Sequence, residues 1–189
     1  MKMISLDSIS NNQSPEAKEQ AAQVQEGRIA VISWLGIARK PSGQVANKLK
    51  KLGFAEDIIK LVLDSLEEDG YLNDDAAAGR IVSQRSGRLA ESRFALNQRL
   101  QRLGIKDTSI DNVLPGALTD LEAASQLVDV RFGKTIEQST LSSGRECLVL
   151  QDPAVKKLYF KIGRFLLGRG FSQSVILQVL GEYFSDVDS

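Results

Sequence analysis

The chain repeats itself three times, and this internal repeat constrains its fold more than any other feature. Segments that begin at Lys48, Arg99 and Phe165 align without gaps. The aligned positions share a glycine, a leucine four residues before it, an isoleucine six residues after it and a following Val-Leu pair: Gly53, Gly104 and Gly170; Leu49, Leu100 and Leu166; Ile59, Ile110 and Ile176; Val62-Leu63, Val113-Leu114 and Val179-Leu180. Such self-similarity is typical of proteins that stack one small structural unit several times.

Each repeat predicts a helix, a turn and a second helix. The shared glycine follows a leucine-bearing segment, as expected of a residue that ends a helix in the left-handed conformation. Ser172 and Asp107 are predicted N-caps of the helices that follow, and the aliphatic residues after each glycine recur at the spacing of one helix face. A further helix is predicted before each pair, at 28–39, about 74–86 and about 119–132.

These elements predict an all-α fold of nine principal helices in three tandem three-helix units that form an elongated, curved helical array. Residues 1–24 are predicted to be a flexible N-terminal tail that gains helix towards its end. The units are placed at 25–72, 73–118 and 119–189, and the third carries a loop insertion at about 134–152 that could hold a small hairpin. Leu49, Leu100 and Leu166 are expected to be buried at equivalent positions.

Composition argues against catalysis. Histidine is absent and Cys147 is the single cysteine, which removes Ser-His-Asp and Cys-His catalysis and the usual zinc sites. Gly133-Lys134-Thr135 is not a phosphate-binding loop, because that loop requires a glycine where Val128 stands. We therefore expect no enzyme activity, no cofactor and no metal. With no signal sequence and no apolar run of about 18 residues, the chain is expected to be cytoplasmic and not to enter a membrane.

Charge is segregated along the chain although the net charge is zero. Residues 28–60 carry seven Lys/Arg against two Asp/Glu, and residues 80–106 carry seven against one, whereas 61–79 and 107–130 carry acids and no base. The second helix of the first repeat is acidic, so DNA phosphates would repel it and it is not expected to enter a major groove. Contact with a polyanion is expected instead from the two basic helices of each unit.

Two basic doublets occupy the same place in the repeat. Lys48 and Lys51 precede Gly53 as Arg99 and Arg102 precede Gly104, and residues three apart share a helix face. The third repeat has Phe165 and Gly168 at these positions, so the basic ridge is expected to stop there. Either the doublets contact a partner, or they form a solvated helix face; the sequence leaves both interpretations open.

Several segments resemble the RecX family of recombination regulators. They are KLKKLGFAEDIIKLVLDSLEEDGYL at 48–72, GYLNDD at 70–75 and KKLYFKIGRFLLGRGFSQSVI at 156–176, and the resemblance spans about residues 27–184. The chain departs from the family's pattern at Val45, at Ala77 and in the insertion.

The resemblance implies a monomeric inhibitor of RecA that settles on the RecA–DNA filament and damps its extension, ATP hydrolysis and strand exchange, with at most weak non-specific DNA binding of its own. The candidate residues for contact with RecA or DNA are all basic: Arg39, Lys40, Lys48, Lys51, Arg80, Arg85, Arg88, Arg93, Arg99, Arg102, Lys161, Arg164 and Arg169. Two other functions fit the residues. A non-sequence-specific nucleic-acid-binding protein would bind DNA strongly by itself, and a helical-repeat scaffold for other proteins would not involve DNA.

Overall fold

The computed structural model describes residues 15–35, 40–143 and 148–185. Within these residues the chain forms nine α-helices, two short 3-10 turns and two short strands, which confirms the all-α prediction. None of the helices described is both long and apolar enough to cross a membrane. The chain divides into two compact units that meet in sequence at Asp74 and Asp75. The division into three three-helix units and the elongated shape stay predictions.

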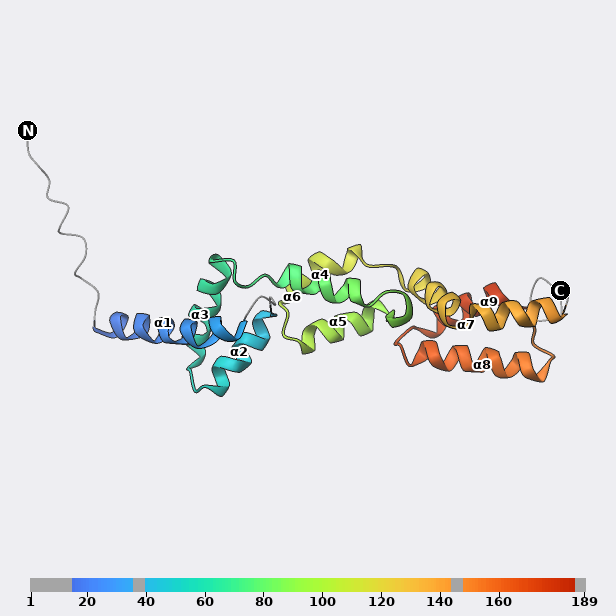
Figure 1. The fold of residues 1–189 in the computed structure, drawn as a ribbon, viewed down its shortest axis with the longest axis horizontal. Coiled ribbons are helices and arrows are strands. Elements are labelled where there is room, and N and C mark those ends of the chain that lie inside the picture. The colour runs from blue at the N-terminus through green and yellow to red at the C-terminus, as the bar shows by residue number, and fades with distance from the viewer. Residues whose placement is uncertain (1–14, 36–39, 144–147, 186–189) are drawn as a thin grey trace, which may run out of the picture. The chain divides into compact units, whose positions relative to one another are not determined.

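The first compact unit contains α1 (Pro15–Leu35), α2 (Ser42–Lys51) and α3 (Glu56–Glu68), which pack on one another (Figure 1). A Cβ atom on Gly27 would lie 2.9 Å from Cγ2 of Val62, so the glycine allows α1 to approach α3 closely. The hydrophobic core of this unit is built from all three helices and from Leu72, in the segment after α3: Val31, Leu35, Val45, Leu49, Ile58, Ile59, Val62, Leu66 and Leu72.

The second compact unit begins within α4 (Asp74–Gln84) and continues through the 3-10 turn Gly87–Leu89, α5 (Arg93–Arg102), α6 (Asp107–Val113) and a second 3-10 turn, Leu114–Gly116. Its first hydrophobic cluster lies between α4, α5 and α6 and contains Ala77, Ala78, Leu100, Ile105 and Ile110.

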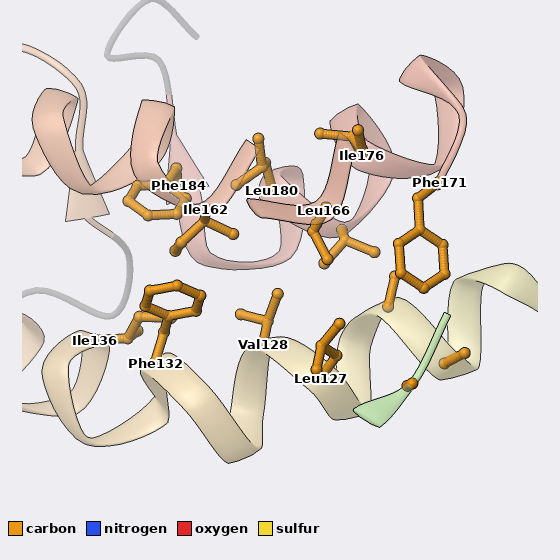
Figure 2. Close-up of a cluster of buried hydrophobic side chains, with 14 of the residues drawn as sticks. Leu127, Val128, Phe132, Ile136, Ile162, Leu166, Phe171, Ile176, Leu180 and Phe184 are labelled. Atoms are coloured by element: carbon orange, nitrogen blue, oxygen red, sulfur yellow. The ribbon is translucent and has the colours of Figure 1, made fainter. Parts of the chain in front are cut away.

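A larger cluster lies between α7 (Asp120–Ser143), α8 (Pro153–Leu167) and α9 (Gln173–Tyr183). Figure 2 shows the α7 side chains pointing towards those of α8 and α9, with Val128 and Phe132 facing Ile162 and Leu166. Strand β1 (Leu148–Val149) pairs in parallel with β2 (Phe184–Ser185), which follows α9 directly. The strands therefore join the segment before α8 to the residues that follow α9.

The repeat is confirmed at its glycines and leucines. Gly53, Gly104 and Gly170 have φ angles of 91°, 72° and 85°, each just beyond the end of a helix. The amide of Gly53 donates to the carbonyl of Lys50 at 3.1 Å, and the next amide, of Phe54, donates to that of Leu49 at 3.3 Å. These bonds satisfy carbonyls that the end of α2 leaves open. Leu49, Leu100 and Leu166 are all 0% exposed.

In the first two repeats, an aspartate side chain accepts hydrogen bonds at the N-terminus of the helix that precedes the shared glycine, α2 or α5. The Ser42 amide and hydroxyl donate to the Asp74 carboxylate at 2.8 and 2.6 Å. The Arg93 amide, at the equivalent place in α5, donates to Asp120 Oδ1 at 2.7 Å. Asp74 is the first residue of α4 and Asp120 is the first residue of α7, so each side chain bonds to the start of an earlier helix. Helix N-termini present open N–H groups that favour an anionic partner.

Helix α1 begins at Pro15, so residues 15–24 are helical and mostly exposed, which agrees with the helix predicted towards the end of the tail. These residues are mainly Ala, Glu, Gln and Lys, which lose little side-chain freedom in a helix. The tail prediction for residues 1–14 lies outside the described part of the chain. Ser172 caps α9 as predicted, since its hydroxyl accepts from the Val175 amide at 3.4 Å. Asp107 was wrongly predicted as a cap: it is the first residue of α6 and Lys106 precedes it.

The prediction of a loop from residue 134 was wrong for residues 134–143, because α7 continues to Ser143. Ile136 follows Phe132 by one helical turn and is 7% exposed, so the buried face of α7 extends past Gly133. The Ser139 and Thr140 hydroxyls donate to the carbonyls of Thr135 and Ile136, four residues earlier. These polar side chains are thus satisfied within the helix. The short sheet is parallel, so residues 148–149 do not form the suggested hairpin; residues 144–147 lie outside the description.

Candidate functional site

In the first compact unit the candidate cations lie around the ends of α2. Lys48 and Lys51 occupy its last turn, where the helix dipole favours positive charge. Lys51 is exposed and Lys48 half-buried, and neither side chain has an ion pair or hydrogen bond among the described residues. Lys40 instead packs over the Trp34 ring, 3.5 Å from its centroid, and donates to the Trp34 carbonyl at 3.1 Å. Arg39 lies outside the described residues.

In the second compact unit three candidate arginines surround one buried carboxylate. Glu91 is 8% exposed and follows the 3-10 turn before α5. Arg99 donates to both of its oxygens, from Nε at 3.0 Å and from the terminal nitrogen at 2.6 Å, and Arg85 donates at 3.3 Å. Arg169 is close enough to act on it by charge. We call Arg85, Glu91, Arg99 and Arg169 the Glu91 cluster.

The Glu91 cluster carries more positive than negative charge. Burial by itself raises the pKa of Glu91, but the hydrogen bond from Arg99 and the charges of Arg99, Arg85 and Arg169 outweigh it and leave that pKa below its ordinary value. The carboxylate is therefore ionised near neutral pH and balances one guanidinium. Two positive charges remain, and the side chains of Arg85 and Arg99 are still 29% and 37% exposed. The arrangement holds the local fold and presents a basic surface.

Arg93, and also Arg169 of the Glu91 cluster, donate to backbone carbonyls. Arg93 donates to the carbonyls of Ala117 and Leu118 at 2.7 and 3.1 Å, so it holds the segment between α6 and α7 against the start of α5. Arg169 donates to the carbonyl of Ala90 at 3.3 Å, and its own carbonyl accepts from the Ser92 amide at 3.2 Å. These contacts connect the turn before α9 with the turn before α5, so both arginines have a structural part.

The remaining candidates lie on the surface of the same compact unit. Arg80, Arg88 and Arg164 are exposed, and Arg80 has an interaction within the chain. Arg102 donates to Gln98 Oε1 at 3.0 Å, and the Lys161 ammonium lies 5.9 Å from the centroid of the Phe132 ring. A partner can therefore contact Arg102 and Arg164 without breaking an ion pair among the described residues.

The structure distinguishes the two basic doublets. Arg102 is exposed like Lys51, but Arg99 is held by Glu91, whereas Lys48 has no such partner among the described residues. Sequence reasoning did not single out Glu91, although it is the one acid among the seven bases of residues 80–106. It also did not single out Arg28, whose guanidinium donates to Ser65 and Asp69 and so joins α1 to α3. The signal that could have identified Glu91 was a lone acid within a basic stretch. The sequence around Arg28 carries no comparable signal.

Replacing Glu91 with glutamine is expected to lower the free energy of unfolding by about 1.5–3 kcal/mol, the usual range for hydrogen bonds to charged groups. The matched control is Glu56→Gln. Glu56 pairs with Lys50 at 3.5 Å, but these side chains are 88% and 68% exposed, so a change under about 0.5 kcal/mol is expected. Urea denaturation of both variants measures the difference. Equal losses would show that the Glu91 cluster contributes no more than a surface ion pair.

The same pair of proteins tests the pKa of Glu91 by its pH dependence. A carboxyl whose pKa is lowered in the folded state stabilises above its ordinary pKa, and this contribution is lost as pH falls through the lowered value. The stability difference between the parent chain and Glu91→Gln should therefore be constant above about pH 4.5, the ordinary value for Glu, and shrink at lower pH. A difference that grows on acidification would contradict the lowered pKa.

Within the residues that the structure describes, no group of Cys, Asp and Glu side chains is arranged to hold a metal ion. At the Glu91 cluster the one carboxylate is occupied by guanidinium groups, so the charge left to a partner is positive. The site supports recognition of a negatively charged partner.

Comparison with known proteins reveals similarity over most of the chain. No family model matches it. Regulatory protein RecX of Mycobacterium leprae (strain Br4923) is 29% identical over 158 residues, which cover 82% of this chain and 84% of the relative. Regulatory protein RecX of Streptococcus pyogenes serotype M5 (strain Manfredo) is 25% identical over 187 residues, or 99% of this chain and 67% of the relative.

Two solved structures share the fold. The crystal structure of RecX from Lactobacillus salivarius superposes with a TM-score of 0.62 at 21% identity, covering 86% of this chain and 97% of the other. A second, titled as a crystal structure of regulatory protein RecX, has a TM-score of 0.64 at 21% identity and covers 96% and 83%. The comparisons by sequence and by fold confirm the resemblance that the sequence predicts.

Proposed function

We propose, on the premise that this chain is a RecX-type regulatory protein in sequence and fold, that it binds the RecA–DNA filament and inhibits recombinase activity. The observation that carries the proposal is the sequence similarity to the Mycobacterium leprae regulator, at 29% identity over 82% of this chain. The protein acts by binding, has no turnover of its own, and works in the cytoplasm as a monomer. Its targets are filament extension, ATP hydrolysis and strand exchange.

The charged surfaces support binding to a nucleoprotein filament. Helix α3 exposes five acids and would be repelled by phosphates: Glu56, Asp57, Asp64, Glu67 and Glu68. The cations that remain open to a partner lie on α2, α5 and α8 and in the turn before α5, and include Lys51, Arg88, Arg102 and Arg164. Contacts of this kind depend on backbone charge rather than base sequence.

Titration of the protein into RecA on single-stranded DNA tests the proposal. ATP hydrolysis by RecA should fall as the protein is added, and the protein alone should hydrolyse no ATP. Unchanged hydrolysis at a large molar excess would refute the proposal. Strong binding to DNA alone at physiological salt, with no effect on RecA, would favour a nucleic-acid-binding protein instead.

Charge reversal at the open cations is expected to weaken inhibition at least about tenfold. The variant changes Lys48, Lys51 and Arg102 to Glu and leaves Arg99 in place, because Arg99 holds Glu91. Lost phosphate contacts weaken a charged complex and make its affinity less sensitive to salt, by about 0.7 in the log–log slope per contact with a single strand. Glutamate is nearly as good a helix former as lysine, so the helices should persist.

The matched control reverses three exposed lysines outside the candidate set: Lys18, Lys60 and Lys134. Its net charge changes by the same amount, so a general effect of charge would weaken both variants equally. Inhibition and salt dependence should stay near those of the parent chain in the control. If the two variants behave alike, Lys48, Lys51 and Arg102 form only a solvated face.

A further inference from the structure

A hydrophobic groove lies between α8 and α9, and its lining includes Ile176 and Leu180 of the buried core. Its floor is formed where Gly163 faces α9: a Cβ atom there would lie 3.7 Å from Leu180 Cδ1 and 3.9 Å from Ile176 Cγ2. Phe160 and Leu167 line it from α8, and Leu177 lines it from α9. We call this surface the α8–α9 groove.

The apolar side chains that form the walls of the α8–α9 groove are unusually exposed for hydrophobic residues. Phe160 is 53% exposed, Leu167 64% and Leu177 53%. Single exposed apolar side chains are common on protein surfaces, but three that converge on one groove are typical of a binding surface.

The other two repeats provide an internal comparison for this surface. The residues aligned with Leu167 are Lys50 and Gln101, and those aligned with Leu177 are Lys60 and Asp111. In the first repeat the ion pair between Lys50 and Glu56 spans the corresponding place. At these two positions the face is therefore polar and exposed in the first two repeats and apolar in the third, so the repeat fold does not require the leucines. The position of Phe160 differs, because the second repeat also has an exposed aromatic residue there, Phe94.

Arg164, the one charged residue among those that line the groove, is positive. Helix α8 carries four cations and no acid: Lys156, Lys157, Lys161 and Arg164. Arg164 is exposed and lines the groove. The acid of α9, Glu182, accepts a hydrogen bond from the Ser125 hydroxyl of α7 at 3.2 Å. A partner seated here would meet apolar walls with a positive border, and acidic residues beside its apolar face would complement that border.

We propose that the α8–α9 groove docks an amphipathic helix of a partner protein, with leucine-like anchors on one face and acidic residues beside them. Phe160 and Leu167 are seven residues apart on α8, about two helical turns. A groove of that length between two helices accepts a third helix whose anchors recur every three or four residues. The site extends beyond the proposed function: Arg164 is one of the cations named there, but the apolar walls are not, and the test needs neither RecA nor DNA.

The side-chain types favour a protein over a nucleic acid as the occupant. Binding of single strands relies on bases stacked against aromatic rings. Two aromatic residues line the groove, but Tyr159 is half-buried and packs edge to face on Phe160, so only Phe160 is exposed. Leu167 and Leu177 offer no flat surface for a base.

The test measures binding of the full chain to a synthetic amphipathic helix of about five turns, labelled with fluorescein, with leucines on one face and glutamates beside them. A twin peptide carries lysine in place of each glutamate. Fluorescence anisotropy should show the acidic peptide bound at least about tenfold more tightly than its twin. Arg164→Gln, which copies Gln98 of the second repeat, should reduce this preference.

The double variant Leu167→Gln/Leu177→Gln removes two of the three exposed apolar side chains of the walls without adding charge and should weaken binding of the acidic peptide at least about tenfold. Leu141→Gln is the matched control, because Leu141 is 76% exposed on α7 and does not line the groove. Circular dichroism should be unchanged in both variants. Equal binding of the two peptides, or of the double variant and the control, overturns the proposal.

Two further outcomes would assign the groove to another occupant and so overturn the proposal. One is loss of oligothymidine binding, rather than of peptide binding, in the double variant. The other is self-association of the parent chain in light scattering that the double variant abolishes, which would make a second copy the occupant.

Discussion

Replacement of Leu166 by alanine is expected to lower the free energy of unfolding by about 2–5 kcal/mol, the usual range for a buried leucine. Leu166 is 0% exposed and lies in the cluster between α7, α8 and α9 (Figure 2). The loss combines the transfer energy of the removed carbons with the cavity that the neighbouring helices cannot fill. Urea denaturation followed by circular dichroism measures it.

The adjacent residue is the control for that prediction. Leu167 has the same chemistry and lies in the same helix, but it is 64% exposed. Leu167→Ala should change the free energy of unfolding by less than about 0.5 kcal/mol. If both substitutions cost the same, the side chain of Leu166 is not part of a packed core. A stable Leu167 variant would also show that the α8–α9 groove can be altered without unfolding its helices.

Replacement of Gly170 by alanine is expected to cost about 2–4 kcal/mol, from two causes. Its φ of +85° disfavours any residue with a Cβ atom, by about 1–2 kcal/mol. The new Cβ would also lie 2.8 Å from Ser92 Oγ and 3.0 Å from Ala95 Cβ. Ser92 is 0% exposed and its hydroxyl caps α5 by accepting from the Ala95 amide at 3.1 Å, so it cannot easily move aside.

Gly53 separates these two causes. It occupies the same place in the first repeat with a φ of +91°, but a Cβ atom there would meet nothing within 4 Å. Gly53→Ala should therefore show only the cost of the backbone conformation, about 1–2 kcal/mol. Thermal and urea denaturation of the two variants give the comparison. A loss for Gly170→Ala no greater than that for Gly53→Ala would mean that the two turns, at Ser92 and at Gly170, are not tightly packed.

The helix pairs could be predicted because their signals are local. Leu49, Leu100 and Leu166 recur at the same distance from a glycine, and both the helical period and the left-handed turn are encoded within a few residues. The extension of α7 beyond Gly133 lacked such a signal, since Ser139 and Thr140 are common in loops. Their hydroxyls bond to the helix's own carbonyls, and Ile136 is buried in a cluster that α7 forms with α8 and α9.

The candidate site was predictable in composition but not in arrangement. The basic stripes were visible in the sequence, yet Lys51 and Arg102 differ from Arg99 and Arg169 only through their neighbours in space. Glu91 lies 8 residues from Arg99, and Arg169 donates to a backbone carbonyl 79 residues away. A pattern of charges along the chain cannot tell a guanidinium held by a buried carboxylate from one that faces solvent.

By itself the sequence determined the repeat, the helical class and the resemblance, because periodicity and turn chemistry depend on residues close along the chain. The tertiary structure decided which cations have a structural part, and it showed that Leu167 and Leu177 stand open beside Arg164. Both depend on packing between segments far apart in sequence. The apolar pattern of α8 and α9 predicts burial for Leu166 and Leu167 alike. In the structure, α7 packs against the side of the helix pair that carries Leu166 and leaves Leu167 exposed.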